Sequence, residues 1–163
     1  MAAGVTYSNI STTTLGTASA TVSFSSIPST YTDLILVCSI LGADATRLWS
    51  FNGDTASNYS YTFVRGDGST ATSGRGTTEK MFIAFCDITN TTQPTVAIAN
   101  FQNYSNTSTY KTVVMRGSAV GKWVSASIGM WRSTAAINSF TISTDAGSFG
   151  VGSTFTLYGV TNA

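Results

Sequence analysis

The sequence contains no histidine and few charged residues. Of 163 residues, 8 are Lys or Arg and 7 are Asp or Glu, which gives a formal net charge of +1. Histidine is the commonest general base and metal ligand in proteins, so its absence argues against Ser-His triads and metalloenzymes. The basic residues are scattered singly and form no stripe that could bind a phosphate backbone. We therefore expect no nucleic acid partner, no metal and no cofactor.

Long hydrophobic runs and prolines are also scarce. The longest apolar run, Leu34 to Cys38, is far shorter than the roughly 20 residues of a membrane span. Residues 1–7 have neither the basic nor the apolar region of a secretory signal. We expect no membrane partner and synthesis in a cytoplasm. The two prolines, Pro28 and Pro94, lie before expected strands and interrupt none of them.

There are two cysteines, Cys38 and Cys86, and each lies in an apolar segment. Because cysteine in such surroundings behaves as a small hydrophobe, we predict buried thiols. A disulfide bond between adjacent strands is the alternative, since the sequence does not give the distance between them.

Carboxylates are the remaining candidates for acid–base chemistry. Most of them are isolated in turn-like sequences, where Asp commonly bonds to its own backbone. We therefore assign no catalytic residue. Asp54 and Asp67 could each offer one oxygen to calcium, but neither lies in the dense carboxylate spacing of a calcium loop. The seven acids are Asp33, Asp44, Asp54, Asp67, Glu79, Asp87 and Asp145.

Seven polar aromatic residues could stack on sugars. We expect them in the core or at a subunit interface instead, where large aromatic side chains are most often buried. They are Trp49, Tyr59, Tyr61, Tyr104, Tyr110, Trp123 and Trp131.

Alternating apolar and small polar residues dominate what the sequence does contain. Residues 20–25, 123–130 and 154–157 alternate in this way, which is typical of strands with one buried face. Leu34 to Cys38 and Met81 to Cys86 are apolar at every position, which is typical of central strands covered on both faces.

Further strands are expected at 46–51, 59–65, 94–101, 110–117 and 137–143, with Gly and Asx turns between most of them. About ten short strands predict an all-β fold, an antiparallel two-sheet sandwich of jelly-roll type; a closed barrel is the alternative. Residues 20–163 form a single domain in this interpretation. Residues 1–19 form either an N-terminal extended arm or an edge strand, and we favour the arm.

Four blocks of the sequence follow one another in a recognisable order. They are residues 27–34, residues 51–59, a W-R-S-T-x-x-I stretch at 131–137 and a G-S-x-F-x-L-Y-G strand at 152–159. Together they resemble β-rich virion proteins of tailed bacteriophages, cyanophages among them. Residues 1–19 and 66–78 depart from the resemblance.

The resemblance implies a non-enzymatic virion structural protein. The specific protein that the resemblance implies is a capsid cement (decoration) protein. Such a protein is a homotrimer on the outer capsid surface that binds the major capsid protein and stabilises the shell. Such a protein is made in the host bacterial cytoplasm and ends on the virion. The candidate contact elements are the N-terminal arm at residues 2–14 and a variable loop at residues 66–78.

Two alternatives remain open. One is a tail-fibre or receptor-binding module that recognises host surface glycan. The other is a depolymerase-like enzyme, which requires two of the seven acids to converge.

Overall fold

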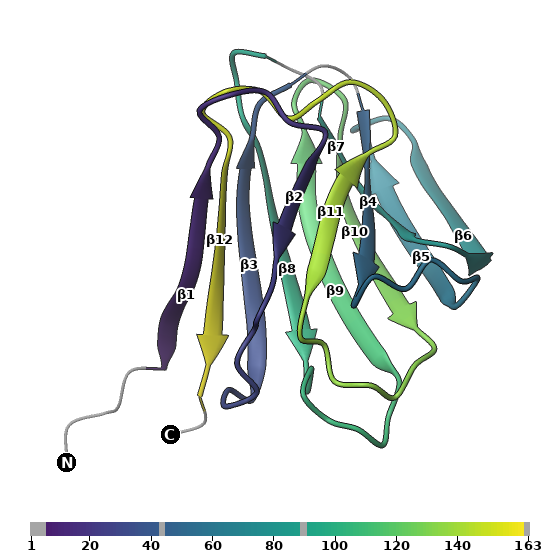
Figure 1. The fold of residues 1–163 in the computed structure, drawn as a ribbon. Helices are drawn as coiled ribbons and strands as arrows, with labels where there is room; N and C mark the ends of the chain where they lie inside the picture. The colour runs from purple at the N-terminus through teal and green to yellow at the C-terminus, as the bar shows by residue number, and fades with distance from the viewer. Residues whose placement is uncertain (1–5, 43–44, 89–90, 162–163) are drawn as a thin grey trace.

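The computed structural model describes residues 6–42, 45–88 and 91–161, and for residues 45 and 82–88 it describes the backbone alone. The chain forms two antiparallel sheets packed face to face (Figure 1). Within the described ranges there are twelve strands and no α-helix, and hence no helix that could span a membrane. The predicted all-β class and the antiparallel two-sheet sandwich are confirmed.

The larger sheet has eight strands. In spatial order they are β1 (Tyr7–Thr14), β12 (Thr154–Val160), β3 (Asp33–Ile40), β8 (Thr95–Gln102), β9 (Lys111–Ala119), β10 (Trp123–Trp131), β5 (Tyr59–Gly66) and β6 (Ala71–Glu79). The smaller sheet has four strands. They are β2 (Thr21–Phe24), β11 (Phe140–Thr144), β4 (Ala45–Phe51) and β7 (Phe82–Ile88).

The connections carry the chain repeatedly from one sheet to the other. The larger sheet contains the run β1-β12-β3-β8 and the smaller sheet the run β2-β11-β4-β7. Two hairpins, β5-β6 and β9-β10, extend the larger sheet beyond β8. The jelly-roll subtype depends on these connections and stays a prediction.

All ten expected strands are present. The two further strands are the edges of the larger sheet: β1, which was the less favoured alternative for its segment, and β6, which was not predicted. An edge strand carries few core-facing side chains, so it lacks the apolar alternation of its neighbours. In β6, Gly74 and Gly76 lie under aromatic rings: a Cβ added at Gly76 would stand 2.5 Å from the ring of Tyr61. Residues 71–79 are thus a strand and not part of a loop.

The N-terminal segment shows the same effect. Residues 7–14 pair with β12, and Ile10 and Leu15 pack against the core. Of the two alternatives for this segment, the structure has the edge strand in place of the favoured arm. Residues 1–5 lie outside the described residues.

The core between the sheets is centred on aromatic rings. Phe51 of β4 contacts Phe101 of β8 at a ring-centroid distance of 6.0 Å, Trp131 of β10 at 5.7 Å and Phe140 of β11 at 6.5 Å. Of the seven polar aromatic residues, Trp49, Tyr59, Tyr104 and Trp131 are buried, as expected for core residues. Tyr61 and Trp123 are half-buried, and Tyr110 is 54% exposed.

The closing strand has the register expected from its alternation. Phe155 and Leu157 are fully buried, whereas Thr156 is half-buried on the opposite face. Beside them, Gly159 lies under the ring of Tyr31, where an added Cβ would stand 2.3 Å from a ring carbon.

We expect Leu157→Ala to lower the free energy of unfolding by about 2–5 kcal/mol, because it opens a cavity in the core. Thr156→Ala is the matched control on the neighbouring residue and should cost far less. Thermal or urea unfolding of both variants measures the difference. Equal losses would mean that the strand register is wrong.

We expect the Cys38 thiol to be unreactive in the native protein, because it is buried in the core with 2% of its surface exposed and forms no disulfide. A thiol reagent should label Cys38 only after denaturation, and mass spectrometry of the labelled peptides identifies the site. Rapid native labelling at Cys38 would contradict its burial. The side chain of Cys86 lies outside the described residues, so its predicted burial remains open.

Candidate interaction surface

One face of the larger sheet is apolar and uncovered. The smaller sheet packs on the opposite side of the larger one, and no other described element lies over this face (Figure 1). We call it the outer face and define it by the outward side chains of β3, β8, β9, β10 and β5. Its apolar members are Ile35, Val37, Val64, Val96, Ile98, Val114, Val124, Ala126, Ile128 and Met130.

The apolar residues of the outer face line up in rows across the strands. One row runs Val37, Ile98, Arg116, Ala126, Val64, with each residue paired to the next. In the neighbouring rows, Val114 is 37% exposed, Ile128 53% and Val124 66%. Several large aliphatic side chains side by side in solvent are unusual for a free monomer and are typical of an interaction surface.

Burial of Trp131 explains why β10 turns its apolar residues outward. Side chains of a strand alternate between its faces, so burying Trp131 also places Ser127 and Gly129 inside and Ile128 outside. The alternation predicted for 123–130 is confirmed, and the apolar set is the exposed one. The small inner residues leave room for β7, which packs over β10.

Asp54 holds Trp131 in place. The indole Nε1 of Trp131 donates a hydrogen bond to the Asp54 carboxylate at 2.6 Å, and Asn58 Nδ2 and the backbone N–H of Ala56 donate to the same carboxylate at 3.0 and 2.9 Å. The bond from Asn58 is the largest cause that lowers the pKa of Asp54 from its ordinary 3.8; burial opposes it, and Trp131 and Ala56 add to it. The ionised form of Asp54 is therefore part of the native structure.

The central strand β3 departs from expectation in an informative way. Leu34, Leu36 and Cys38 are buried, as predicted, but Ile35 and Val37 on the outer face are half-buried. This strand was predicted to be covered by a layer on each face. Among the described residues, only its inner face is covered, by the smaller sheet. Residues 81–86 were also predicted to form a strand covered on both faces, but the side chains of residues 82–86 lie outside the described residues.

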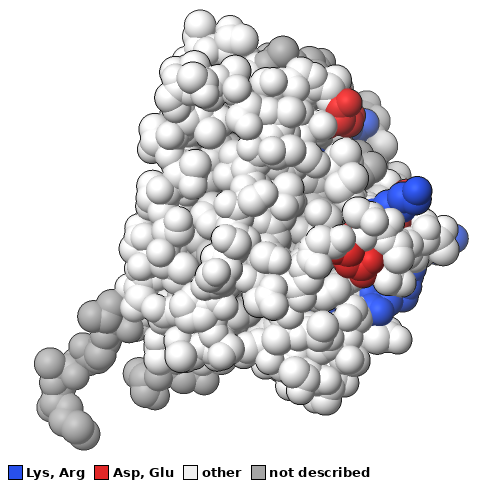
Figure 2. Space-filling model, viewed as in Figure 1, with Lys and Arg blue, Asp and Glu red and all other residues white. Residues whose placement is uncertain are grey.

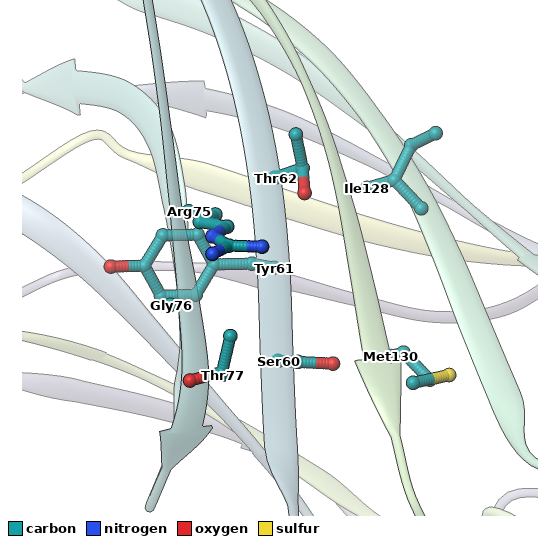
Figure 3. Close-up of a pocket in the computed structure, with 8 residues that line it drawn as sticks. All are labelled: Ser60, Tyr61, Thr62, Arg75, Gly76, Thr77, Ile128 and Met130. Carbon is teal, nitrogen blue, oxygen red and sulfur yellow. The ribbon is translucent and has the colours of Figure 1, made fainter.

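Shallow grooves cross the outer face. One groove of about 370 Å³ runs along β10, β5 and β6, where Ile128 and Met130 stand beside Ser60 and Thr62 (Figure 3). Another of about 360 Å³ lies between β8 and β10, beside Val96, Arg116 and Val124. Their walls are aliphatic side chains, hydroxyls and a few arginines, a lining suited to another apolar surface.

Of the four aspartates whose side chains are described, Asp54 and Asp67 have the predicted local turn role, whereas Asp33 and Asp145 bind the backbone of distant segments. Asp33 accepts a hydrogen bond from the backbone N–H of Asn103, and Asp145 accepts one from that of Thr46. Asp67 accepts the N–H groups of Ser69 and Thr70, as Asp54 accepts that of Ala56. Asp44 and the side chain of Asp87 lie outside the described residues. Among the rest, no group of three or more potential metal-ligand side chains comes together.

Charged side chains are few on the opposite side of the molecule as well. Figure 2 shows the side that bears the smaller sheet, where most of the surface is uncharged and the Lys, Arg, Asp and Glu side chains gather toward one flank.

The outer face was not predicted from the sequence, because the apolar residues of an alternating strand are normally assigned to the core. The one sequence signal for this face was that Trp131 shares its side of the strand with Ser127 and Gly129, so that burying Trp131 exposes Ile128.

No protein-family model matches the chain, and no curated protein matches it. Its function is therefore inferred from its own residues.

We expect Asp54→Ala to destabilise the protein by about 1–3 kcal/mol at pH 7, because it leaves the buried indole N–H of Trp131 without its acceptor. The loss should shrink as the pH falls below about 4. The folded-state pKa of Asp54 is depressed, so its contribution is present above the unfolded pKa and disappears as the carboxylate protonates. Thermal unfolding from pH 7 to pH 2 measures both effects.

Asp67→Ala is the control for this prediction, since Asp67 lies in the exposed turn after β5 and bonds only within that turn. If both variants lowered the unfolding midpoint equally at pH 7, the anchoring role of Asp54 would be refuted.

Proposed function

We propose that this protein is a non-enzymatic structural subunit of a tailed-phage virion, a capsid cement protein that binds the outer capsid surface as a trimer. The observation that carries the proposal is the outer face, an apolar sheet surface across five strands over which no other described strand packs. Such a surface is suited to lasting contact with another protein subunit, as in an oligomer that forms part of a virion.

The low charge of the chain supports the same proposal. Only 9% of the residues are charged, so most contacts that the protein makes are apolar or involve hydroxyl groups. Such contacts depend little on ionic strength. When one oligomer bridges several sites on a shell, individually weak contacts add up to strong attachment.

The strand connections support the jelly-roll interpretation that accompanies the phage resemblance. Strands β1, β12, β3 and β8 face β2, β11, β4 and β7, and the chain alternates between these two sets. Two four-stranded layers connected in this way are the arrangement of a jelly roll, a fold that occurs in viral capsid proteins among others.

The four blocks that carry the resemblance meet in the structure as two pairs. Tyr31 of the first block lies on Gly159 of the last. Asp54 of the second block binds Trp131 of the third, and Arg132 donates to the carbonyl of Ser57 at 2.7 Å. Because residues of different blocks contact one another, the four blocks form one structural signature, and this supports the resemblance that they carry together.

A receptor-binding module is the second candidate, and one observation favours it. A groove of about 390 Å³ lies between the β5–β6 and β9–β10 turns, with Trp123 in its lining. Aromatic rings of this kind can stack on a host glycan. Arg65 and Lys122 lie 4.2 and 5.3 Å from the centre of this ring, so it is already engaged by two cations, and we rank the glycan function second.

We expect the purified protein to bind tailed-phage capsids that lack a cement protein, and to raise the temperature at which they release DNA. Co-sedimentation at low and at high salt measures attachment, which should persist at high salt because few charges take part. The control is binding to host polysaccharide, which should be absent. Binding to polysaccharide with no attachment to capsids would favour the receptor-binding module.

A further inference from the structure

We infer that the outer face is the contact between copies of this chain, so that a second copy covers the apolar surface that β3, β8, β9, β10 and β5 leave open. The inference rests on the proposed function in that it assigns the surface through which the proposed trimer forms. It commits to self-association and leaves the remaining surface of each copy for the shell.

The sequence of β3 is the first argument. Its residues 34–38 have the both-sided apolar pattern of a strand with a layer on each face. In the folded chain, one layer is present over Leu34 and Leu36, and Ile35 and Val37 face outward. The sequence is patterned for two layers and the described residues supply one, which supports a second layer from another copy of the chain.

Charge is the second argument. With a formal net charge of +1, two copies of the protein repel each other very weakly, and a protein near zero net charge tends to associate. Arg116 is the one charged side chain in the row of described residues from Val37 to Val64. Arg75 of β6 lies at the margin of the outer face beside Thr62. Arg116 is exposed, and its flexible stem allows the guanidinium to reach the solvated rim of a contact.

Size is the third argument. Five strands spaced about 4.8 Å apart, each contributing about six residues, make a patch about 24 Å wide and about 20 Å long. With the relief of its side chains, such a patch approaches the roughly 800 Å² that each partner buries in a stable interface. The outer face is therefore large enough to hold two copies together.

Availability separates a second copy from other occupants. The outer face exists once the chain has folded, and a second copy of the chain is present wherever the chain is made. Covering the face at once also protects an apolar surface from unspecific aggregation.

The test measures the mass of the native protein in solution by analytical ultracentrifugation over a concentration series. The wild type should be an oligomer at micromolar concentration. Ile128→Lys places a charge in the centre of the outer face and should weaken self-association at least about tenfold, or abolish it. Val124→Lys is a second variant on the same face and should act in the same direction.

Val151→Lys is the matched control. Val151 is 58% exposed, close to the 53% of Ile128, but it lies in the turn before β12 and away from the outer face. This variant should associate like the wild type. Because all three positions are exposed, the unfolding midpoints should stay near that of the wild type, which shows that loss of association does not reflect loss of folding.

A wild type that is monomeric at high concentration would overturn the inference, and so would an oligomer that all three variants leave intact or disrupt equally. The capsid assay reports separately on the proposed function. If the protein is an oligomer that Ile128→Lys disrupts but it does not bind capsids, the interface is supported and the cement role is refuted. If the protein is a monomer that binds capsids, the interface is refuted and the cement role is supported.

Discussion

The fixed alternation of side chains along a strand, together with the burial of Trp131, is the constraint on which the rest of this structure depends. Once the indole is buried against Phe51 and bound to Asp54, every second residue of β10 must face solvent. Hydrogen bonding to β9 and β5 then transmits that choice to Val114 and Val64. A single buried aromatic side chain thus fixes which surface of the larger sheet is apolar and exposed.

The same constraint links stability to function. The core combines large aromatic rings with aliphatic residues such as Leu36, Val113 and Ile142, and further valines and isoleucines stand on the outer face. On the outer face those residues provide a broad, nearly uncharged surface, and the proposed self-contact and the proposed place in a larger assembly both follow from it.

Patterning found the ten strands that pack against the core, left β1 as the less favoured alternative for its segment and did not find β6. Strands β1 and β6 are held by backbone pairing and by contacts such as the Tyr61 ring over Gly76, which leave no periodic signal in the sequence. The turn role of Asp54 and Asp67 could also be predicted, because it is a local effect: Asp67 bonds to residues two and three positions away. The bonds of Asp33 and Asp145 join segments far apart in the chain and could not be predicted.

The sequence by itself determined the fold class, the positions of the core strands and the near absence of charge, since all three depend on composition and on a two-residue period. The apolar parity of β12 faces the core as expected, but only the tertiary structure decided which parity of β10 does so. Period-two alternation is symmetrical, and both faces of β10 and β3 carry residues that could be buried. The contact of Trp131 with Asp54, 77 residues apart in the chain, breaks that symmetry, and no local pattern contains it.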